Sequence, residues 1–161
     1  MRVSQTTPER VLAAARERGM TIACAESLTG GQIASRLVDV PGASDAFIGG
    51  VVAYDASVKV GVLGVDADLL ASHGPVSAEV ASAMASGVRA LMGADIAVAT
   101  TGAAGPTPHG GRAPGTYYVA LADASGVVVN EVVHGGSREQ VRDAAVATAL
   151  ELLIHALGET P

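Results

Sequence analysis

A chain of 161 residues is long enough for one domain with its own hydrophobic core, and its net charge of −6 argues against nucleic acids and anionic membranes as partners. Its single cysteine, Cys24, excludes an internal disulfide. No apolar run reaches the roughly 20 residues that span a bilayer. The polar start also lacks the apolar stretch of a signal peptide, so we expect a cytoplasmic protein without a membrane partner.

The first predicted element is a helix that begins after Thr7, its expected N-cap, and runs to about Arg18. Gly19 follows as the residue that ends this helix. Residues 21–25 are predicted to form a short buried strand. The spacing of apolar residues over 31–38 predicts a second helix.

The middle of the chain alternates in the same way. Apolar and β-branched residues over 47–54 predict a strand, and a short helix is expected near Val58 in an otherwise ambiguous stretch. A helix is predicted over 66–72. Ser77 is the expected N-cap of a longer, alanine-rich helix that ends at Met92.

The last third begins with a predicted strand over 95–101 and a loop over 102–115 that is rich in glycine and proline. Residues 116–122 and 127–134 flank a turn and predict a β-hairpin. A final helix, which opens with a capping-box pattern, is predicted to run to about Leu157.

Together these elements predict an α/β fold with a mixed β-sheet flanked by helices. The late hairpin argues against a purely parallel sheet. Because no repeat or interdomain linker interrupts the pattern, we expect a single domain over residues 1–161 with a core of about 8–157. Apolar surface on the alanine-rich helices favours a homo-oligomer.

The stretch TIACAESLTGG, residues 21–31, places Ser27 between a predicted strand and a predicted helix. A helix N-terminus presents unpaired N–H groups that can stabilise an oxyanion or bind a phosphate. Gly30 and Gly31 would let a ligand approach the backbone closely. Ser27 is therefore a candidate nucleophile. The alternative is that Ser27 or Thr29 only caps the helix that follows.

A serine nucleophile needs a base, and the chain offers histidines and one lysine. The histidines lie in turns, at a strand end and on the last helix, without metal-ligand spacing: His73, His109, His134 and His155. Lys59 is the only lysine among ten basic residues, and a buried lysine can lose its proton whereas an arginine does not. We predict Lys59 as the base and Tyr54 as a group that relays a proton or orients the amine. The alternatives are a surface lysine and a strand-end tyrosine with its hydroxyl in solvent.

Six motifs then follow one another in a specific order. They are AESLTGG (25–31), Tyr54 with Lys59 five residues later, HGPVS (73–77), TGAAGP (101–106), PGT (114–116) and GSREQVR (136–142). As a set they resemble the CinA C-terminal domain family, whose enzymes are nicotinamide-nucleotide amidohydrolases. The resemblance covers about residues 11–157.

This resemblance implies the hydrolysis of nicotinamide mononucleotide to nicotinate mononucleotide and ammonia, in pyridine-nucleotide salvage, without a metal or a cofactor. It places the active serine on Ser27, the lysine on Lys59 and the tyrosine on Tyr54. Ser27 would attack the carboxamide, with Lys59 as the base and later as the acid. Backbone N–H groups over 28–31 would hold the oxyanion.

The small-molecule nucleotide substrate also carries a phosphate, for which three groups are candidates. These are the N–H groups of Gly30 and Gly31, the loop over 102–105, and Arg138 at the start of the last helix. The full set of expected substrate-binding residues is Thr29, Gly30, Gly31, Thr101, Gly102, Gly105 and Arg138. The alternatives are ordinary turn chemistry for the loop and a solvated first-turn residue for Arg138.

The sequence departs from the family pattern after the tyrosine, where Ser or Thr and then Asn are usual and Asp55 and Ala56 stand here. Asp55 is expected to keep a nearby Lys59 protonated. Ser137 replaces an aspartate that often precedes the arginine. The alternative functions are therefore a nucleotide-binding module without hydrolysis and a competence-linked interaction module. We expect no activity of the N-terminal molybdopterin-binding-like domain that many full-length relatives carry, because the chain is too short to contain it.

Overall fold

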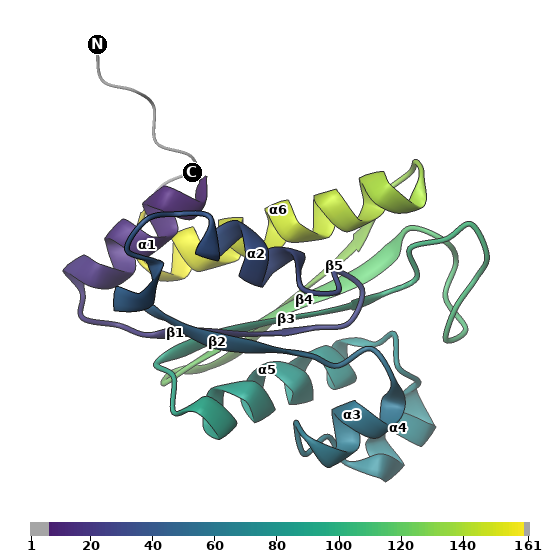
Figure 1. The fold of residues 1–161 in the computed structure, drawn as a ribbon. Coiled ribbons are helices and arrows are strands. Elements are labelled where there is room, and N and C mark those ends of the chain that lie inside the picture. The colour runs from purple at the N-terminus through teal and green to yellow at the C-terminus, as the bar shows by residue number, and fades with distance from the viewer. Residues whose placement is uncertain (1–6, 160–161) are drawn as a thin grey trace.

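Residues 7–159, which the computed structural model describes, form a five-stranded mixed sheet with helices on both faces (Figure 1). The strands are β1 Ile22–Glu26, β2 Phe47–Val52, β3 Ile96–Gly102, β4 Thr116–Asp123 and β5 Gly126–Val133. Their order in the sheet is β2-β1-β3-β4-β5. β1 is parallel to β2 and β3, whereas β4 is antiparallel to β3 and β5. This confirms the predicted α/β fold and its late hairpin.

Two layers of helices cover the sheet. One layer holds α1 Thr7–Glu17, α2 Gln32–Val38 and α6 Arg138–Ala156, and the other holds α3 Ala56–Gly61, α4 Ala67–His73 and α5 Ala78–Met92 (Figure 1). A short 3₁₀ helix, η1 Ala43–Asp45, precedes β2. No helix in the part of the chain from 7 to 159 is both long and apolar enough to cross a membrane.

Side chains of each strand alternate between two hydrophobic clusters, as the geometry of a strand requires. Cys24 belongs to the cluster under α1, α2 and α6, whereas Ala23 and Ala25 belong to the cluster under α5. Both clusters are filled mainly by Ala, Val, Leu and Ile, in keeping with a chain that has one Phe and no Trp.

Short polar side chains begin four of the described helices, and the caps of α5 and α6 are the predicted ones. Ser77 caps α5, and Ser137 forms with Gln140 the capping box that begins α6. α1 already includes Thr7, one residue earlier than expected, so Thr7 is not its N-cap. The residue before Thr7 lies outside the described range, as do the outermost residues of the predicted domain.

The start of α2 differs from the alternative in which Ser27 or Thr29 would cap it. Its N-cap is Gly31, at a left-handed φ of 103°, and no side chain of the cap residue bonds to the helix. Instead the carboxylate of Glu26 accepts from the N–H groups of Ile33 at 2.8 Å and Ala34 at 3.1 Å. The side chain at the end of β1 therefore takes the capping role and leaves the hydroxyl of Ser27 available.

The carboxyl ends of the parallel strands meet at one edge of the sheet. Glu26 of β1 lies opposite Val52 of β2 and Thr100 of β3. The segments that follow these three strands are therefore neighbours, although they lie far apart in sequence. In open α/β sheets this edge is where ligands bind.

Candidate active site

Ser27 follows β1 directly and is 8 % exposed. Its N–H donates to the carbonyl of Thr100 at 3.0 Å, which fixes the residue against β3. Its Oγ lies 2.9 Å from Nζ of Lys59, 32 residues further along the chain. The structure thus brings the predicted nucleophile and the predicted base within hydrogen-bond distance.

Lys59 reaches Ser27 from α3 and is only 2 % exposed. Besides Ser27, its Nζ lies 2.8 Å from the carbonyl oxygen of Ala53 and 3.2 Å from that of Tyr54. An ammonium group would donate one proton to each of these three oxygens. A neutral amine would donate to the two carbonyls and keep its lone pair for the hydroxyl proton of Ser27. The neutral amine therefore has the arrangement of a base.

Burial lowers the pKa of Lys59, because desolvation disfavours its charged form, and the nearby charge of Asp55 opposes this only in part. The charge of Asp55 thus acts in the expected direction, but burial has the larger effect on the pKa of Lys59. Asp55 is the N-cap of α3, and its carboxylate accepts from the N–H and the hydroxyl of Ser57. These hydrogen bonds lower the pKa of Asp55 itself.

Tyr54 contacts Lys59 through its carbonyl oxygen, and its phenol lies elsewhere. The hydroxyl accepts from Nη2 of Arg138 at 3.2 Å, and the side chain is largely exposed. Nη1 of the same arginine donates to the carbonyl of Gly105 at 3.0 Å. Arg138 thus ties the end of the β2 segment to the loop after β3.

A cleft of about 410 Å³ opens above Ser27 and Lys59. This volume falls in the range of about 300–1,000 Å³ that is usual for small-ligand sites. Its walls include most of the predicted site residues, namely Ser27, Lys59, Tyr54, Thr101, Gly102, Gly105 and Arg138. Further wall residues are Leu28, Asp55, Ala56, Pro75, Ala104, Thr107, Pro108 and His109.

Three predicted substrate-binding residues do not line this cleft: Thr29, Gly30 and Gly31. Thr29 is fully buried, and its hydroxyl is bonded to the carboxylate of Glu26 at 2.6 Å and to the hydroxyl of Thr100 at 2.8 Å. The side chain of Thr29 therefore holds the turn together below the cleft.

His109 lies in a glycine- and proline-rich loop, as the sequence predicts, but its place in the cleft is not predictable from the sequence. The loop after β3 folds back so that His109 lies in the wall of the cleft. The length and glycine content of this loop were the only signals in the sequence, and neither singles out one residue.

Glu26 is a second residue whose importance the sequence did not reveal. It is 1 % exposed and accepts from the Thr29 hydroxyl, from two N–H groups of α2 and from the thiol of Cys24. Burial, together with this carboxylate, raises the pKa of the Cys24 thiol well above its ordinary value. A glutamate within an apolar strand was the available signal, because charged residues are seldom fully buried without hydrogen-bond partners.

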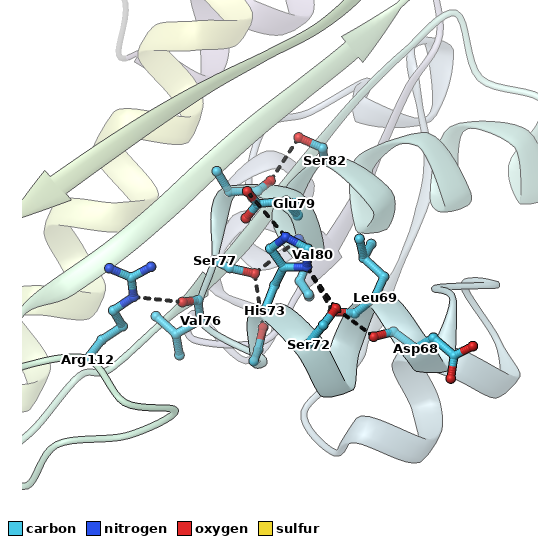
Figure 2. A network of polar contacts seen from close by, with 12 residues as sticks. Asp68, Leu69, Ser72, His73, Val76, Ser77, Glu79, Val80, Ser82 and Arg112 are labelled. Carbon is cyan, nitrogen blue, oxygen red and sulfur yellow. Dashed lines mark hydrogen bonds and ion pairs between the residues drawn. The ribbon is translucent and has the colours of Figure 1, made fainter.

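A polar network between α4 and α5 holds the Pro75 wall of the cleft (Figure 2). The Ser77 hydroxyl donates to the carbonyl of Gly74, and Nε of Arg112 donates to the carbonyl of Val76. Thr101 donates its hydroxyl to the carbonyl of Pro75 itself. The wall is therefore fixed from α5, from the 103–115 loop and from β3.

Over residues 7–159, no group of three or more His, Cys, Asp or Glu side chains is placed to hold a metal ion.

Comparison with known proteins places these features in a family context. Residues 4–157 match the model of the CinA C-terminal domain family. The chain is 48 % identical over 145 residues to a CinA-like protein of Frankia casuarinae, a match that covers 90 % of this chain and 34 % of that protein. The chain thus spans about a third of the length of the curated relatives it matches.

Solved structures match over nearly the whole chain. Competence damage-inducible protein A of Klebsiella pneumoniae matches with a TM-score of 0.90 and 34 % identity, over 98 % of this chain and 100 % of that one. The competence/damage inducible protein CihA of Agrobacterium tumefaciens matches with a TM-score of 0.86 and 34 % identity, over 99 % and 100 % of the two chains.

Proposed function

The chain belongs to the CinA C-terminal domain family, and from the buried contact between Ser27 and Lys59 in its cleft we propose that it is an amidohydrolase acting on nicotinamide mononucleotide. The products are nicotinate mononucleotide and ammonia. The distance of 2.9 Å between Ser27 Oγ and Lys59 Nζ is the observation that carries this proposal. The names of the relatives say only that they are CinA-like or competence-damage inducible.

In the first half of the reaction, Oγ of Ser27 attacks the carboxamide carbon while its proton passes to the neutral amine of Lys59. The lowered pKa of Lys59 supports this role, because it increases the fraction of neutral amine at a given pH. The C–N bond then breaks. Lys59 returns the proton to the leaving nitrogen, which departs as ammonia.

In the second half, water attacks the acyl-enzyme and gives a proton to Lys59. The C–O bond to Ser27 breaks, and Oγ takes the proton back. One water is consumed and one ammonia is released, so the protein ends as it began. The oxyanion of both tetrahedral intermediates needs N–H donors, and we assign this role to the turn after Ser27, beginning with Leu28, which lines the cleft.

The rim of the cleft supports a substrate that carries a negative charge. Arg138 is the one arginine of the described chain in the cleft wall, where it holds Tyr54 and Gly105. A guanidinium has five N–H donors, so Arg138 retains donors for a phosphate after these two contacts. We assign the phosphate of the substrate to this rim and the reaction to cytoplasmic pyridine-nucleotide salvage.

Release of ammonia from nicotinamide mononucleotide by the purified protein tests the proposal, with nicotinate mononucleotide identified as the product. Ser27→Ala and Lys59→Arg should each abolish release. Ser82→Ala is a matched control, because its hydroxyl bonds within α5 and does not line the cleft. Binding of the mononucleotide without release would instead favour the nucleotide-binding module, and neither binding nor release would favour the interaction module.

A further inference from the structure

Arg142 of α6 makes two hydrogen bonds to the turn that follows the nucleophile. Its Nε donates to the carbonyl of Leu28 at 3.1 Å, and its Nη2 donates to the carbonyl of Thr29 at 3.1 Å. These contacts join segments that are more than a hundred residues apart in sequence. A planar guanidinium fork suits two consecutive carbonyls, whereas an ammonium group has no such fixed pair of donors.

These contacts direct the two carbonyls away from the cleft, and the N–H of Gln32 also donates to the Thr29 carbonyl at 3.1 Å. Arg142 does not line the cleft, so the carbonyls of Leu28 and Thr29 are directed to a group outside it. Carbonyl oxygens turned toward the cleft would repel an oxyanion that forms on the substrate. In a planar trans peptide the C=O of one residue points opposite to the N–H of the next residue, so these bonds orient the N–H groups of Thr29 and Gly30 and anchor Leu28 through its own carbonyl.

The N–H groups of this turn are also free to act. Ser27 uses its own N–H on the carbonyl of Thr100. The N–H groups of Leu28, Thr29 and Gly30 make no hydrogen bond to any other residue between 7 and 159. Leu28 is 5 % exposed and lines the cleft, so its N–H is a desolvated donor beside the nucleophile.

Glu26 holds the same turn from within the protein. Its carboxylate binds the Thr29 hydroxyl and the first turn of α2, while Arg142 binds the backbone from α6. Gly30 lies between them at a left-handed φ of 58°, and a Cβ there would be 3.4 Å from Nη2 of Arg142. The turn is therefore fixed from two sides by residues that do not touch the cleft.

We propose that Arg142 is a positioning residue for acyl transfer, which anchors Leu28 through its carbonyl and so keeps the N–H of Leu28 beside the oxyanion formed at Ser27. The proposal rests on the proposed function only in that Ser27 is acylated. It does not depend on which amide is the natural substrate.

The test is the burst of 4-nitrophenolate released from 4-nitrophenyl acetate by wild type and by Arg142→Lys. In this step Ser27 Oγ bonds to the acetyl carbon, the bond to 4-nitrophenolate breaks, and the hydroxyl proton passes to Lys59. The matched control is Arg89→Lys, because Arg89 is also half-buried and its Nε also donates to a backbone carbonyl, that of Asp95, away from the cleft.

We expect Arg142→Lys to slow the burst by about 10- to 100-fold, somewhat less than the loss seen on removing one oxyanion donor. The second readout is the burst rate with the corresponding thiono ester. In this ester sulfur replaces the carbonyl oxygen and accepts hydrogen bonds poorly. The wild type should prefer the oxo ester, and Arg142→Lys should lose much of that preference. The pH dependence of the burst, which reports the titration of Lys59, should be the same in Arg142→Lys as in wild type. Arg89→Lys should change neither the burst rate nor the preference for the oxo ester.

Three results would overturn the proposal. The first is an unchanged burst in Arg142→Lys. The second is a slower burst in Arg142→Lys with the same ratio of oxo-ester to thiono-ester rates as in wild type. The third is a wild type that shows no burst, or only a burst that persists in Ser27→Ala. If Arg142→Lys does not fold, Arg142→Ala with added ethylguanidinium takes its place. Rescue by ethylguanidinium but not by ethylammonium is the expected result, and equal rescue or none is contrary.

The ester carries neither a nicotinamide nor a phosphate, so the burst separates this proposal from the proposed function. A normal, Arg142-dependent burst without turnover of nicotinamide mononucleotide would sustain the positioning role and refute the assigned substrate. If Arg142→Lys turned over the mononucleotide as fast as wild type, the assigned substrate would be sustained and the positioning role refuted.

Discussion

Replacing Glu26 with glutamine tests whether its carboxylate holds the start of α2 and the nucleophile turn. Oε1 accepts from the Thr29 hydroxyl and the N–H of Ile33, and Oε2 accepts from the N–H of Ala34 and the Cys24 thiol. Glutamine keeps one acceptor oxygen, and its NH₂ group would face an N–H or a thiol donor. One buried N–H therefore loses its partner, and the remaining bonds lose their charge.

A hydrogen bond to a charged group is worth about 1.5–3 kcal/mol, so we expect Glu26→Gln to lower the free energy of unfolding by about that amount. For a domain of this size the midpoint of thermal unfolding should fall by roughly 3–12 °C. Urea denaturation and calorimetry measure these quantities. Glu79→Gln is the matched control, since Glu79 is half-exposed and its Oε1 makes a long contact of 3.9 Å with Nε2 of His73. It should change stability by less than about 0.5 kcal/mol.

An unchanged or higher stability of Glu26→Gln would refute this reasoning. It would mean that the cost of burying the carboxylate outweighs the hydrogen bonds that the carboxylate accepts. In that case the dipole of α2 and its N–H groups would not offset the desolvation of the charge.

Three further predictions concern the cleft. Burial lowers the pKa of Lys59 in the folded protein below its ordinary value of 10.5. Between these two pKa values, the unfolded chain binds a proton that the folded protein lacks. The free energy of unfolding should therefore rise with pH across that window. Lys59→Met should remove this slope in denaturation curves measured at several pH values. Gly102→Ala should lower stability by about 1–3 kcal/mol, because a Cβ there would lie 2.6 Å from Cβ of Tyr117; Gly61→Ala has open space and should not destabilise. Arg138→Lys should raise KM for nicotinamide mononucleotide more than for nicotinamide riboside, which lacks the phosphate; equal changes in the two steady-state KM values would remove Arg138 from the phosphate site.

The fold could be predicted from the sequence because its signals are local. The Ser77 cap, the Ser137–Gln140 capping box and the hairpin turn before Gly126 each depend on a few neighbouring residues, and all lie where they were expected. Errors at helix ends stayed within one or two residues. The strand order was not predictable in this way, because it depends on contacts between distant segments.

The candidate site could likewise be predicted only where its signals are local. Ser27 and Lys59 could be selected because their residue types carry chemistry, and the structure then placed them 2.9 Å apart. The positions of Arg142 and His109 depend on how α6 and the 103–115 loop pack against the turn and cleft, which no local pattern encodes. The sequence likewise indicates the charge of Asp55 but not the burial of Lys59, which has the larger effect on the pKa of Lys59.

The solitary lysine of this arginine-rich chain occupies a position that arginine could not fill. Nζ of Lys59 meets two carbonyl oxygens and one hydroxyl, which matches the two protons and one lone pair of a neutral amine. A guanidinium would bring five donors and a charge that it does not lose in proteins, so it would leave donors unpaired and could not take the proton of Ser27. In a chain with nine arginines and one lysine, the single lysine lies where the proposed reaction requires a proton to be gained and lost.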